Sequence, residues 1–123
     1  MIGIGVDLCE VERMRAALAR TPRLRDRLFT EAEQDYCDRR TDPTERYAVR
    51  FAAKEAVLKA MGVGVGACKW REIEVARADS GAPSVQLHGG AQRLAEERGI
   101  GRWLLTMTHT DRVAEAIAVA IEP

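Results

Sequence analysis

The sequence of 123 residues is long enough for one domain with one hydrophobic core and too short for two. Its 19 basic and 19 acidic residues cancel, so net charge gives no reason to expect a nucleic acid as partner. No apolar run is long enough to cross a bilayer, so we expect no membrane association. Any charged partner must therefore be recognised by a local patch.

The three cysteines, Cys9, Cys37 and Cys68, are widely spaced and form no C-x-x-C pair. An odd number without a framework is typical of reduced thiols. The sequence also opens directly on an apolar segment, without the basic leader of a secretory signal. We therefore expect a cytoplasmic protein.

A strand followed by a helix is predicted at the start of the chain. Apolar residues alternate with glycines over residues 2–7 and end on Asp7, which indicates a short strand. The next apolar residues have helical spacing, which predicts a first helix around Val11, Met14 and Leu18.

Two further helix starts carry clear signals. Thr30 and Glu33 form a capping box, in which the hydroxyl and the carboxylate satisfy free backbone amides. Asp42 and Pro43 start a long helix, with proline at the first helical position. This helix should run to about Met61, where Gly62 stops it.

The second half of the chain alternates strands with one short helix. The turn-like residues 110–112 favour a hairpin for the last two segments, although their alanine and leucine content would permit helix. The expected elements are a glycine loop at 62–66, strands at 73–75 and 85–87, a helix at 91–98, and the hairpin strands at 103–108 and 113–121. The fold class is α+β: a single small domain over residues 1–123, with a mainly antiparallel sheet and a long central helix.

Asp7 stands at the end of an apolar strand, where a carboxylate is costly unless it caps a helix or meets a cation. It could be the N-cap of the helix that contains Val11. It could equally be a magnesium ligand, because hard cations that bind phosphates take one or two carboxylates. The residue alone does not decide between these roles.

Glu55 and Lys59 lie four residues apart, so they project from one face of the long helix. An ordinary surface ion pair is one interpretation. Ala48 and Ala52 continue the same stripe, however, and the glycine loop at 62–66 follows it. A carboxylate, an ammonium group and a glycine-rich backbone together suit a metal-bound diphosphate.

Two other patterns leave alternatives open. His109, between two threonines, is either a hydrogen-bonded structural residue or a catalyst. Between residues 13 and 27, six arginines face the single acid Asp26. This run is either a solvated face or a docking site for an acidic protein or for phosphate groups.

Four segments together resemble the signatures of the holo-acyl-carrier-protein synthase group of 4′-phosphopantetheinyl transferases. The resemblance runs nearly end to end and in the right order. The segments are Gly3-Ile4-Gly5-Val6-Asp7, Leu28-Phe29-Thr30-Glu31-Ala32-Glu33, Arg50-Phe51-Ala52-Ala53-Lys54-Glu55-Ala56 with Lys59-Ala60, and Thr108-His109-Thr110.

The resemblance implies a homotrimer of α+β subunits that bind coenzyme A in clefts between neighbours. It places Asp7 and Glu55 as the ligands of Mg²⁺, for which Mn²⁺ could substitute, and Lys59 as the group that neutralises the leaving phosphate. A serine of an acidic acyl carrier protein attacks the phosphate that bears the pantetheine, and 3′,5′-adenosine bisphosphate leaves. Glu55, directly or through water on the metal, is the candidate base.

The resemblance also assigns binding residues. The positions expected near the nucleotide or its phosphates are Arg50, Lys54, Gly62, Gly64, His109 and Thr110. The basic positions expected to dock the carrier are Arg13, Arg20, Arg23 and Arg25. Three departures from the family pattern, Val63, Thr106 and Ala82, concern contacts with coenzyme A. The carrier could belong to fatty-acid or polyketide synthesis, and a non-catalytic coenzyme A-binding or carrier-binding module is the alternative function.

Overall fold

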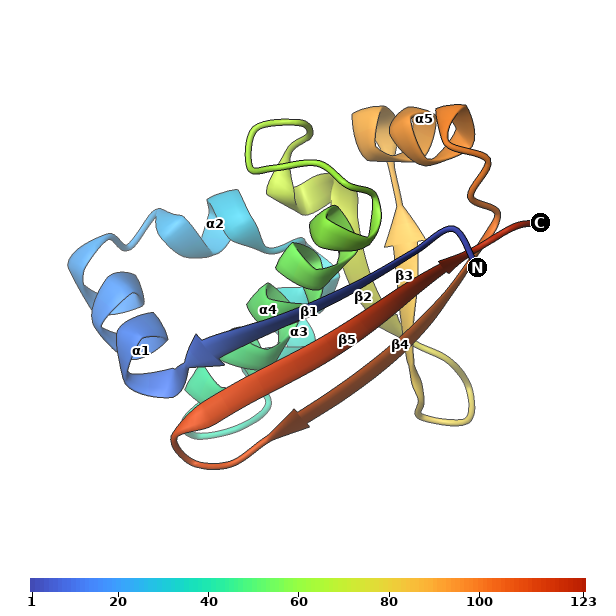
Figure 1. Ribbon diagram of the computed structural model, residues 1–123. Coiled ribbons are helices and arrows are strands. Elements are labelled where there is room, and N and C mark those ends of the chain that lie inside the picture. The colour runs from blue at the N-terminus through green and yellow to red at the C-terminus, as the bar shows by residue number, and fades with distance from the viewer.

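The computed structural model describes residues 1–123 and contains two sheets, five α-helices and one short 3₁₀ turn (Figure 1). In chain order the elements are β1 (Gly3–Glu10), α1 (Val11–Arg20), α2 (Leu24–Leu28), α3 (Glu31–Cys37), α4 (Thr44–Ala60), η1 (Trp70–Glu72), β2 (Ile73–Arg77), β3 (Pro83–Leu87), α5 (Gly89–Glu97), β4 (Arg102–His109) and β5 (Val113–Ile121). This mixture of helices and antiparallel sheets confirms the α+β class.

The larger sheet joins the two ends of the chain. Its strand order is β1-β5-β4, and both pairs are antiparallel. The β4–β5 pair is the hairpin expected at 103–121, and β1 returns along the free side of β5. The second sheet is the antiparallel pair β2–β3. Figure 1 shows the long helix α4 behind the larger sheet, with α1 and α2 at one end of the molecule and α5 at the other.

Small residues let α4 lie directly on the larger sheet. A Cβ atom at Gly3 would stand 1.9 Å from the carbonyl oxygen of Ala60, and one at Gly5 would stand 2.0 Å from that of Ala56. Both distances are far inside van der Waals contact, so only glycine fits at these two positions. Alternate residues of β5 are also small and lie under α4: Ala114, Ala116, Ala118 and Ala120 are all buried.

Two helices begin where the local sequence signals predict, although α4 begins one residue later than expected. The capping box is present: the amide of Glu33 donates to Thr30 Oγ1 over 3.2 Å, and the amide of Thr30 donates to Glu33 Oε1 over 2.8 Å. Pro43 is the N-cap of α4 rather than its first helical residue. The Asp42 carboxylate nevertheless accepts from the amide of Thr44 over 3.1 Å, which supplies the expected cap.

Asp7 is not a helix cap. β1 continues to Glu10, three residues beyond the expected end, because its pairing with β5 runs on from Asp7–Ala116 to Glu10–Val113. Glu10 takes the N-cap position of α1, without a side-chain hydrogen bond. The Asp7 carboxylate is therefore free for another role.

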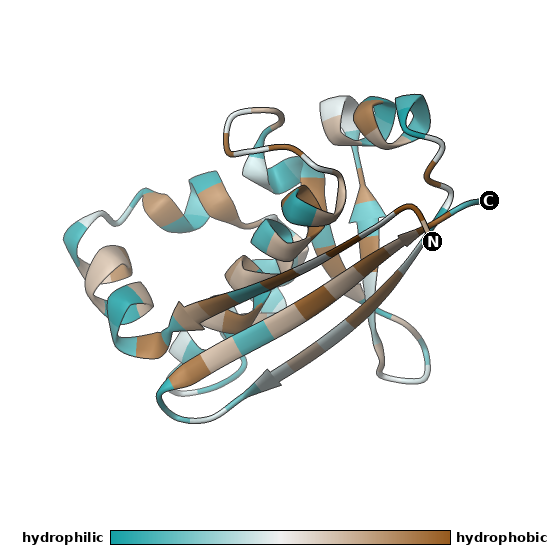
Figure 2. Ribbon diagram, in the orientation of Figure 1, coloured by the Kyte–Doolittle hydropathy of each residue, from teal (hydrophilic) through white to brown (hydrophobic).

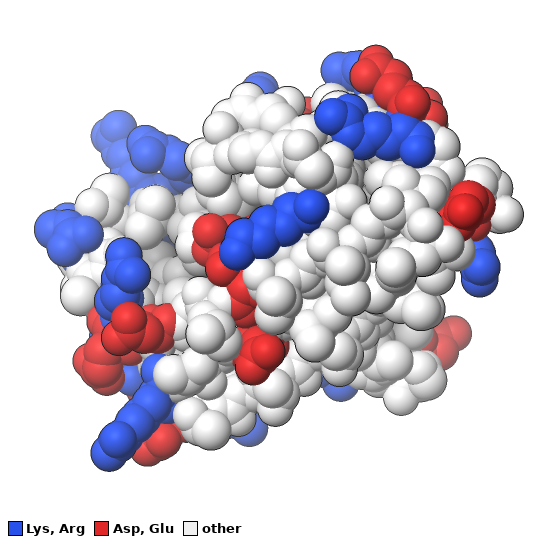
Figure 3. Space-filling model, in the orientation of Figure 1, with Lys and Arg blue, Asp and Glu red and all other residues white.

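The face of the larger sheet that turns away from α4 is largely apolar and uncovered. Its residues Ile4, Val6, Leu8 and Leu104 are between 48% and 59% exposed. Figure 2 shows hydrophobic segments along these strands, and Figure 3 shows few charged side chains over them. We call this surface, formed by Ile4, Val6, Leu8, Leu104, Ile117 and Val119, the open face.

No helix in the chain has both the length and the apolar character needed to cross a membrane. The three cysteines are unpaired, as expected.

Candidate active site

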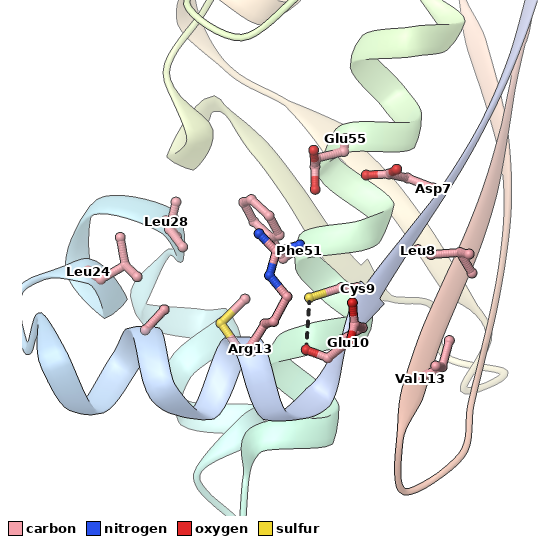
Figure 4. Close-up of a pocket in the computed structure, with 12 residues that line it drawn as sticks. Asp7, Leu8, Cys9, Glu10, Arg13, Leu24, Leu28, Phe51, Glu55 and Val113 are labelled. Atoms are coloured by element: carbon pink, nitrogen blue, oxygen red, sulfur yellow. Dashed lines mark hydrogen bonds between the residues drawn. The ribbon is translucent and has the colours of Figure 1, made fainter.

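Asp7 and Glu55 point toward one another across the contact between β1 and α4 (Figure 4). Asp7 follows Gly3 and Gly5 on the side of β1 that faces the helix, because side chains two residues apart share one face of a strand. The close approach at those glycines brings the carboxylate of Asp7 to α4 next to Glu55.

Lys59 completes a three-residue charged group on this edge. Its ammonium nitrogen lies 3.1 Å from Asp7 Oδ1 and 3.1 Å from the carbonyl oxygen of Val6. No ion pair joins Lys59 to Glu55 along the helix, so the two are not an ordinary surface pair. We refer to Asp7, Glu55 and Lys59 as the carboxylate–lysine group.

Burial and the neighbouring Asp7 carboxylate raise the pKa of Glu55 to about 7. Two carboxylates this close disfavour each other's charge, and a cation between them relieves the repulsion. No group of three or more His, Cys, Asp or Glu side chains is arranged to hold a metal ion, so the protein itself would supply only these two carboxylates. Asp7 and Glu55 therefore fit a Mg²⁺ ion that takes its other oxygen ligands from water and from a bound phosphate.

A cavity of about 560 Å³ opens beside the two carboxylates. Arg13 and Glu10 add charge to its lining, and Figure 4 shows Arg13 rising from α1 toward Phe51. Most of the wall is apolar and comes from β1, α1, α2, α4 and β5: Leu8, Cys9, Met14, Ala17, Leu24, Leu28, Phe51 and Val113. The cavity joins a charged end at Asp7 and Glu55 to an apolar trough between α1 and α2.

The cysteine in this wall is not a nucleophile. Burial raises the pKa of Cys9 to about 11 and that of Cys37 to about 12, and burial also raises the pKa of Cys68. All three are therefore protonated near neutral pH, whereas a thiolate is the reactive form. The site contains no evident nucleophile of its own.

The four arginines expected to dock a carrier do not behave alike. Arg13, Arg20 and Arg23 are exposed and form no ion pair. Arg25 instead contacts the Asp38 carboxylate and donates to the hydroxyl of Tyr47 over 2.9 Å. Arg25 is therefore tied into the fold, while the other three remain available to a partner.

Arg50 and His109 lie in a second cavity of about 310 Å³, on the β4 side of α4. Arg50 is only 3% exposed, and His109 Nδ1 is 2.9 Å from Glu45 Oε1. Thr110 is exposed, and its hydroxyl accepts from the amides of Arg112 and Val113, each over 3.1 Å. The Thr110 hydroxyl thus shapes the hairpin turn.

The expected site residues fall into two groups that a single chain does not bring together. Asp7 lies on β1 and His109 lies on β4, and β5 runs between these strands. Two strand spacings amount to about 10 Å, and α4 lies over the gap. One chain therefore carries two separate groups of expected site residues, one on each side of α4, which we call the two half-sites.

Lys54 does not lie near any surface site. Its side chain is 0% exposed, and its ammonium group donates to Glu33 Oε1 over 2.8 Å and to the carbonyl oxygens of Trp70 and Ile73. The expectation that it contacts a nucleotide is wrong, because every donor points into the core between α3, α4 and β2. Gly62 and Gly64, by contrast, lie in an exposed loop just beyond Lys59.

Several residues of the second cavity carry no sequence signal. Tyr36, Arg40, Arg46 and Arg77 line it together with Arg50, but they come from α3, a loop, α4 and β2. Their separation along the chain gives no spacing pattern that sequence reasoning could use.

Comparison with known proteins agrees with this fold. Residues 3–118 match the family model of the 4′-phosphopantetheinyl transferase superfamily. The holo-[acyl-carrier-protein] synthase of Desulforudis audaxviator is 48% identical over 124 residues, which cover 100% of this chain and 95% of that protein. The crystal structure of the synthase from Neisseria meningitidis has a TM-score of 0.90 at 30% identity and covers 99% of both chains. The synthase of Bacillus anthracis, solved in complex with CoA (3′,5′-ADP), has a TM-score of 0.82 at 30% identity and covers 99% of this chain and 97% of that one.

Proposed function

The chain belongs to the 4′-phosphopantetheinyl transferase superfamily, and we propose that it acts as a holo-acyl-carrier-protein synthase. It transfers 4′-phosphopantetheine from coenzyme A to a serine of an apo acyl carrier protein. The observation that carries this function is the carboxylate–lysine group at the contact between β1 and α4. Residues 1–123 form the single transferase domain.

The reaction forms one bond and breaks another at the same phosphorus atom. The serine oxygen of the carrier bonds to the phosphorus that bears the pantetheine, and the bond from that phosphorus to the bridging diphosphate oxygen breaks. The electron pair leaves with 3′,5′-adenosine bisphosphate, and the serine proton goes to a base. Such a transfer needs positioning and charge neutralisation more than a protein nucleophile, so it does not require a reactive thiol.

Each member of the carboxylate–lysine group has a role. Lys59 places its ammonium charge where the leaving phosphate develops negative charge. Glu55 accepts the serine proton, directly or through water. Asp7 and Glu55 would hold Mg²⁺, or Mn²⁺ in its place, and the ion when bound neutralises the diphosphate of coenzyme A.

The two half-sites support a homotrimer. Coenzyme A has anionic groups at its diphosphate and at its 3′-phosphate, whereas the carboxylate–lysine group and the cavity around Arg50 lie on opposite sides of α4. A neighbouring copy would bring its Arg50 side to the Asp7 side of the first copy. The open face supports such self-association, because four of its apolar residues are about half exposed in the single chain.

The carrier-docking surface lies around the first cavity. Arg13, Arg20 and Arg23 stand near the apolar trough between α1 and α2, and Figure 3 shows basic side chains at this end of the molecule. An acidic amphipathic helix of the carrier fits both features. We assign the protein to the cytoplasm and to fatty-acid or polyketide synthesis, with neither nucleic acid nor membrane as a partner.

Mass spectrometry tests the function directly. Apo acyl carrier protein incubated with the protein, coenzyme A and Mg²⁺ should gain the mass of one 4′-phosphopantetheine. The near-isosteric variants Asp7→Asn and Glu55→Gln are matched controls and should leave the carrier unmodified. A wild-type protein that binds coenzyme A and the carrier without changing the carrier's mass would instead be a non-catalytic binding module.

A further inference from the structure

Four arginines surround the ring of Tyr36 on α3. Their guanidinium carbons lie 4.2 Å from the ring centroid for Arg46, 4.5 Å for Arg50, 4.8 Å for Arg77 and 5.7 Å for Arg39. Each distance is within the range of a cation–π contact. Arg46, Arg50 and Arg77 also line the second cavity, whereas Arg39 does not. One aromatic ring thus gathers cations from α4 and β2 at the wall of one cavity.

This cluster has no carboxylate to balance it. None of the arginines around Tyr36 forms an ion pair with Asp or Glu. Arg50 is 97% buried, and its Nε–H has no hydrogen-bond partner. Like charges held this close repel one another, and a buried donor without a partner is costly. A bound anion with more than one negative charge would balance this cluster.

Tyr36 also fixes two of the arginines through hydrogen bonds. Arg46 donates to the carbonyl oxygen of Tyr36 over 2.7 Å, and Arg77 donates to its hydroxyl over 2.6 Å. Tyr36 therefore holds Arg46 through its backbone carbonyl and Arg77 through its hydroxyl before any ligand arrives. Arginines ordered in advance lose less side-chain entropy when they bind an anion.

We propose that Tyr36 is a positioning residue that arranges Arg46, Arg50 and Arg77 to bind a terminal phosphate monoester of the substrate. The proposal deepens the proposed function, since coenzyme A carries such a group at its 3′ position. A phosphate monoester has nearly two negative charges at neutral pH and three free oxygens, which match a cluster of guanidinium groups. Each group of the diphosphate carries fewer free oxygens and belongs with the carboxylate–lysine group. Tyr36 thereby selects coenzyme A over its 3′-dephospho form.

The test compares two substrates in two variants. Tyr36→Leu removes the ring, and Tyr36→Phe keeps it. We expect Tyr36→Leu to raise the KM for coenzyme A about tenfold or more, with kcat and the KM for 3′-dephospho-coenzyme A nearly unchanged. Tyr36→Phe should recover part of the loss, because the ring still lies against the arginines although the hydrogen bond to Arg77 is gone. Equal rises in both KM values, or no rise in either, would overturn the proposal.

A binding measurement separates this proposal from the proposed transfer reaction. Calorimetry with 3′,5′-adenosine bisphosphate, without carrier, should show the same weakening in Tyr36→Leu, even if the wild type transfers nothing. Arg77→Ala should weaken binding similarly and remains a test if Tyr36→Leu does not fold. Arg39→Ala is the matched control, because Arg39 stacks on the same ring outside the cavity, and its affinity should equal that of the wild type. Unchanged affinity in both Tyr36→Leu and Arg77→Ala would also overturn the proposal.

Discussion

Lys54 and Glu55 are neighbours on α4, and their side chains have opposite roles. Lys54 points into the core, where Glu33 neutralises it and where the carbonyl oxygens of Trp70 and Ile73 satisfy its remaining protons. Glu55 points to the edge of β1 and meets a second carboxylate, that of Asp7. Consecutive residues of a helix point in directions about 100° apart. Lys54 therefore stabilises the core, while Glu55 faces the candidate active site.

The buried pair gives a prediction about stability. Lys54→Met should lower the free energy of unfolding by about 3–5 kcal/mol, because it leaves the Glu33 charge buried without its partner. Denaturant unfolding measures this loss, and Lys54→Met combined with Glu33→Gln should recover part of it. The KM for coenzyme A should change little. If the Lys54→Met protein had normal stability but bound coenzyme A weakly, Lys54 would contact the nucleotide and the structural role assigned to it would be wrong.

Glu55 gives a prediction about pH. Its folded-state pKa of about 7 lies above its ordinary value of 4.5, so the metal-free protein loses stability as the pH rises through this interval. Glu55→Gln should therefore melt at a higher temperature than the wild type in EDTA at about pH 8, and at the same temperature at about pH 4, where Glu55 is protonated in both states. Melting curves across this range are the measurement. A variant that melted lower than the wild type at high pH would contradict the assigned repulsion.

At the scale of elements, α1 and α2 form the surface that we propose docks the carrier. Their arginines divide into those that face solvent and one, Arg25, that is held by Asp38 and Tyr47. Only the first kind can attract an acidic partner. In this short segment, the exposed arginines can therefore serve binding, while Arg25 stabilises the fold.

Arg13→Glu should raise the KM for the apo carrier about tenfold, which corresponds to ~1.4 kcal/mol, and should leave the KM for coenzyme A nearly unchanged. Increasing salt should weaken the wild type more than the variant, because exposed charges are screened. Arg93→Glu on α5, at the other end of the molecule, is the matched control and should behave like the wild type. Steady-state kinetics with varied carrier and salt check this, and equal effects of the two substitutions would contradict a localised docking surface.

Local signals in the sequence predicted most of the elements. The capping box at Thr30 and Glu33 and the hairpin at the C-terminal end depend on residues that are close in sequence, and both are confirmed. The burial of Lys54 depends on hydrogen bonds to Glu33, 21 residues away, and to Ile73, 19 residues away. Helical spacing showed that Lys54 and Glu55 face different ways, but it could not show which of those directions is covered.

The same limit explains the two cavities. Asp7 and Glu55 became a recognisable pair through the resemblance, since no periodicity links a strand residue to a helix residue 48 positions later. The arginines around Tyr36 belong to separate elements and were missed as a group. Arg25 was assigned to docking with its neighbours because a charge run does not reveal which member finds an internal carboxylate.

At the scale of the whole molecule, we propose that the open face mediates self-association. Its apolar residues extend across all three strands of the larger sheet, as Figure 2 shows for the hydrophobic segments of β1 and β5. An uncovered apolar surface of this kind on a small domain favours self-association. Association would also place one half-site beside the other.

Charge on the open face should therefore dissociate the assembly. Val6→Lys combined with Leu104→Lys should give monomers with little transfer activity, because a buried lysine without a partner is costly at an interface. Val65→Lys is the matched control, since Val65 is 73% exposed in a loop away from the open face, and it should stay trimeric. Light scattering after size exclusion measures both. A fully active monomer would contradict the shared site.

The central claim is that each active site takes its carboxylate–lysine group from one copy and its arginine cluster from the next. Two variants test it after their subunits are dissociated and reassembled together: Glu55→Gln, which lacks the base, and Arg50→Ala, which should transfer little at a coenzyme A concentration far below its raised KM. Random mixing in a closed ring leaves about a quarter of the interfaces with both half-sites intact, so the mixture should regain about a quarter of wild-type transfer activity. Activity no higher than the average of the two variants would show that each chain carries a whole site and would contradict the account.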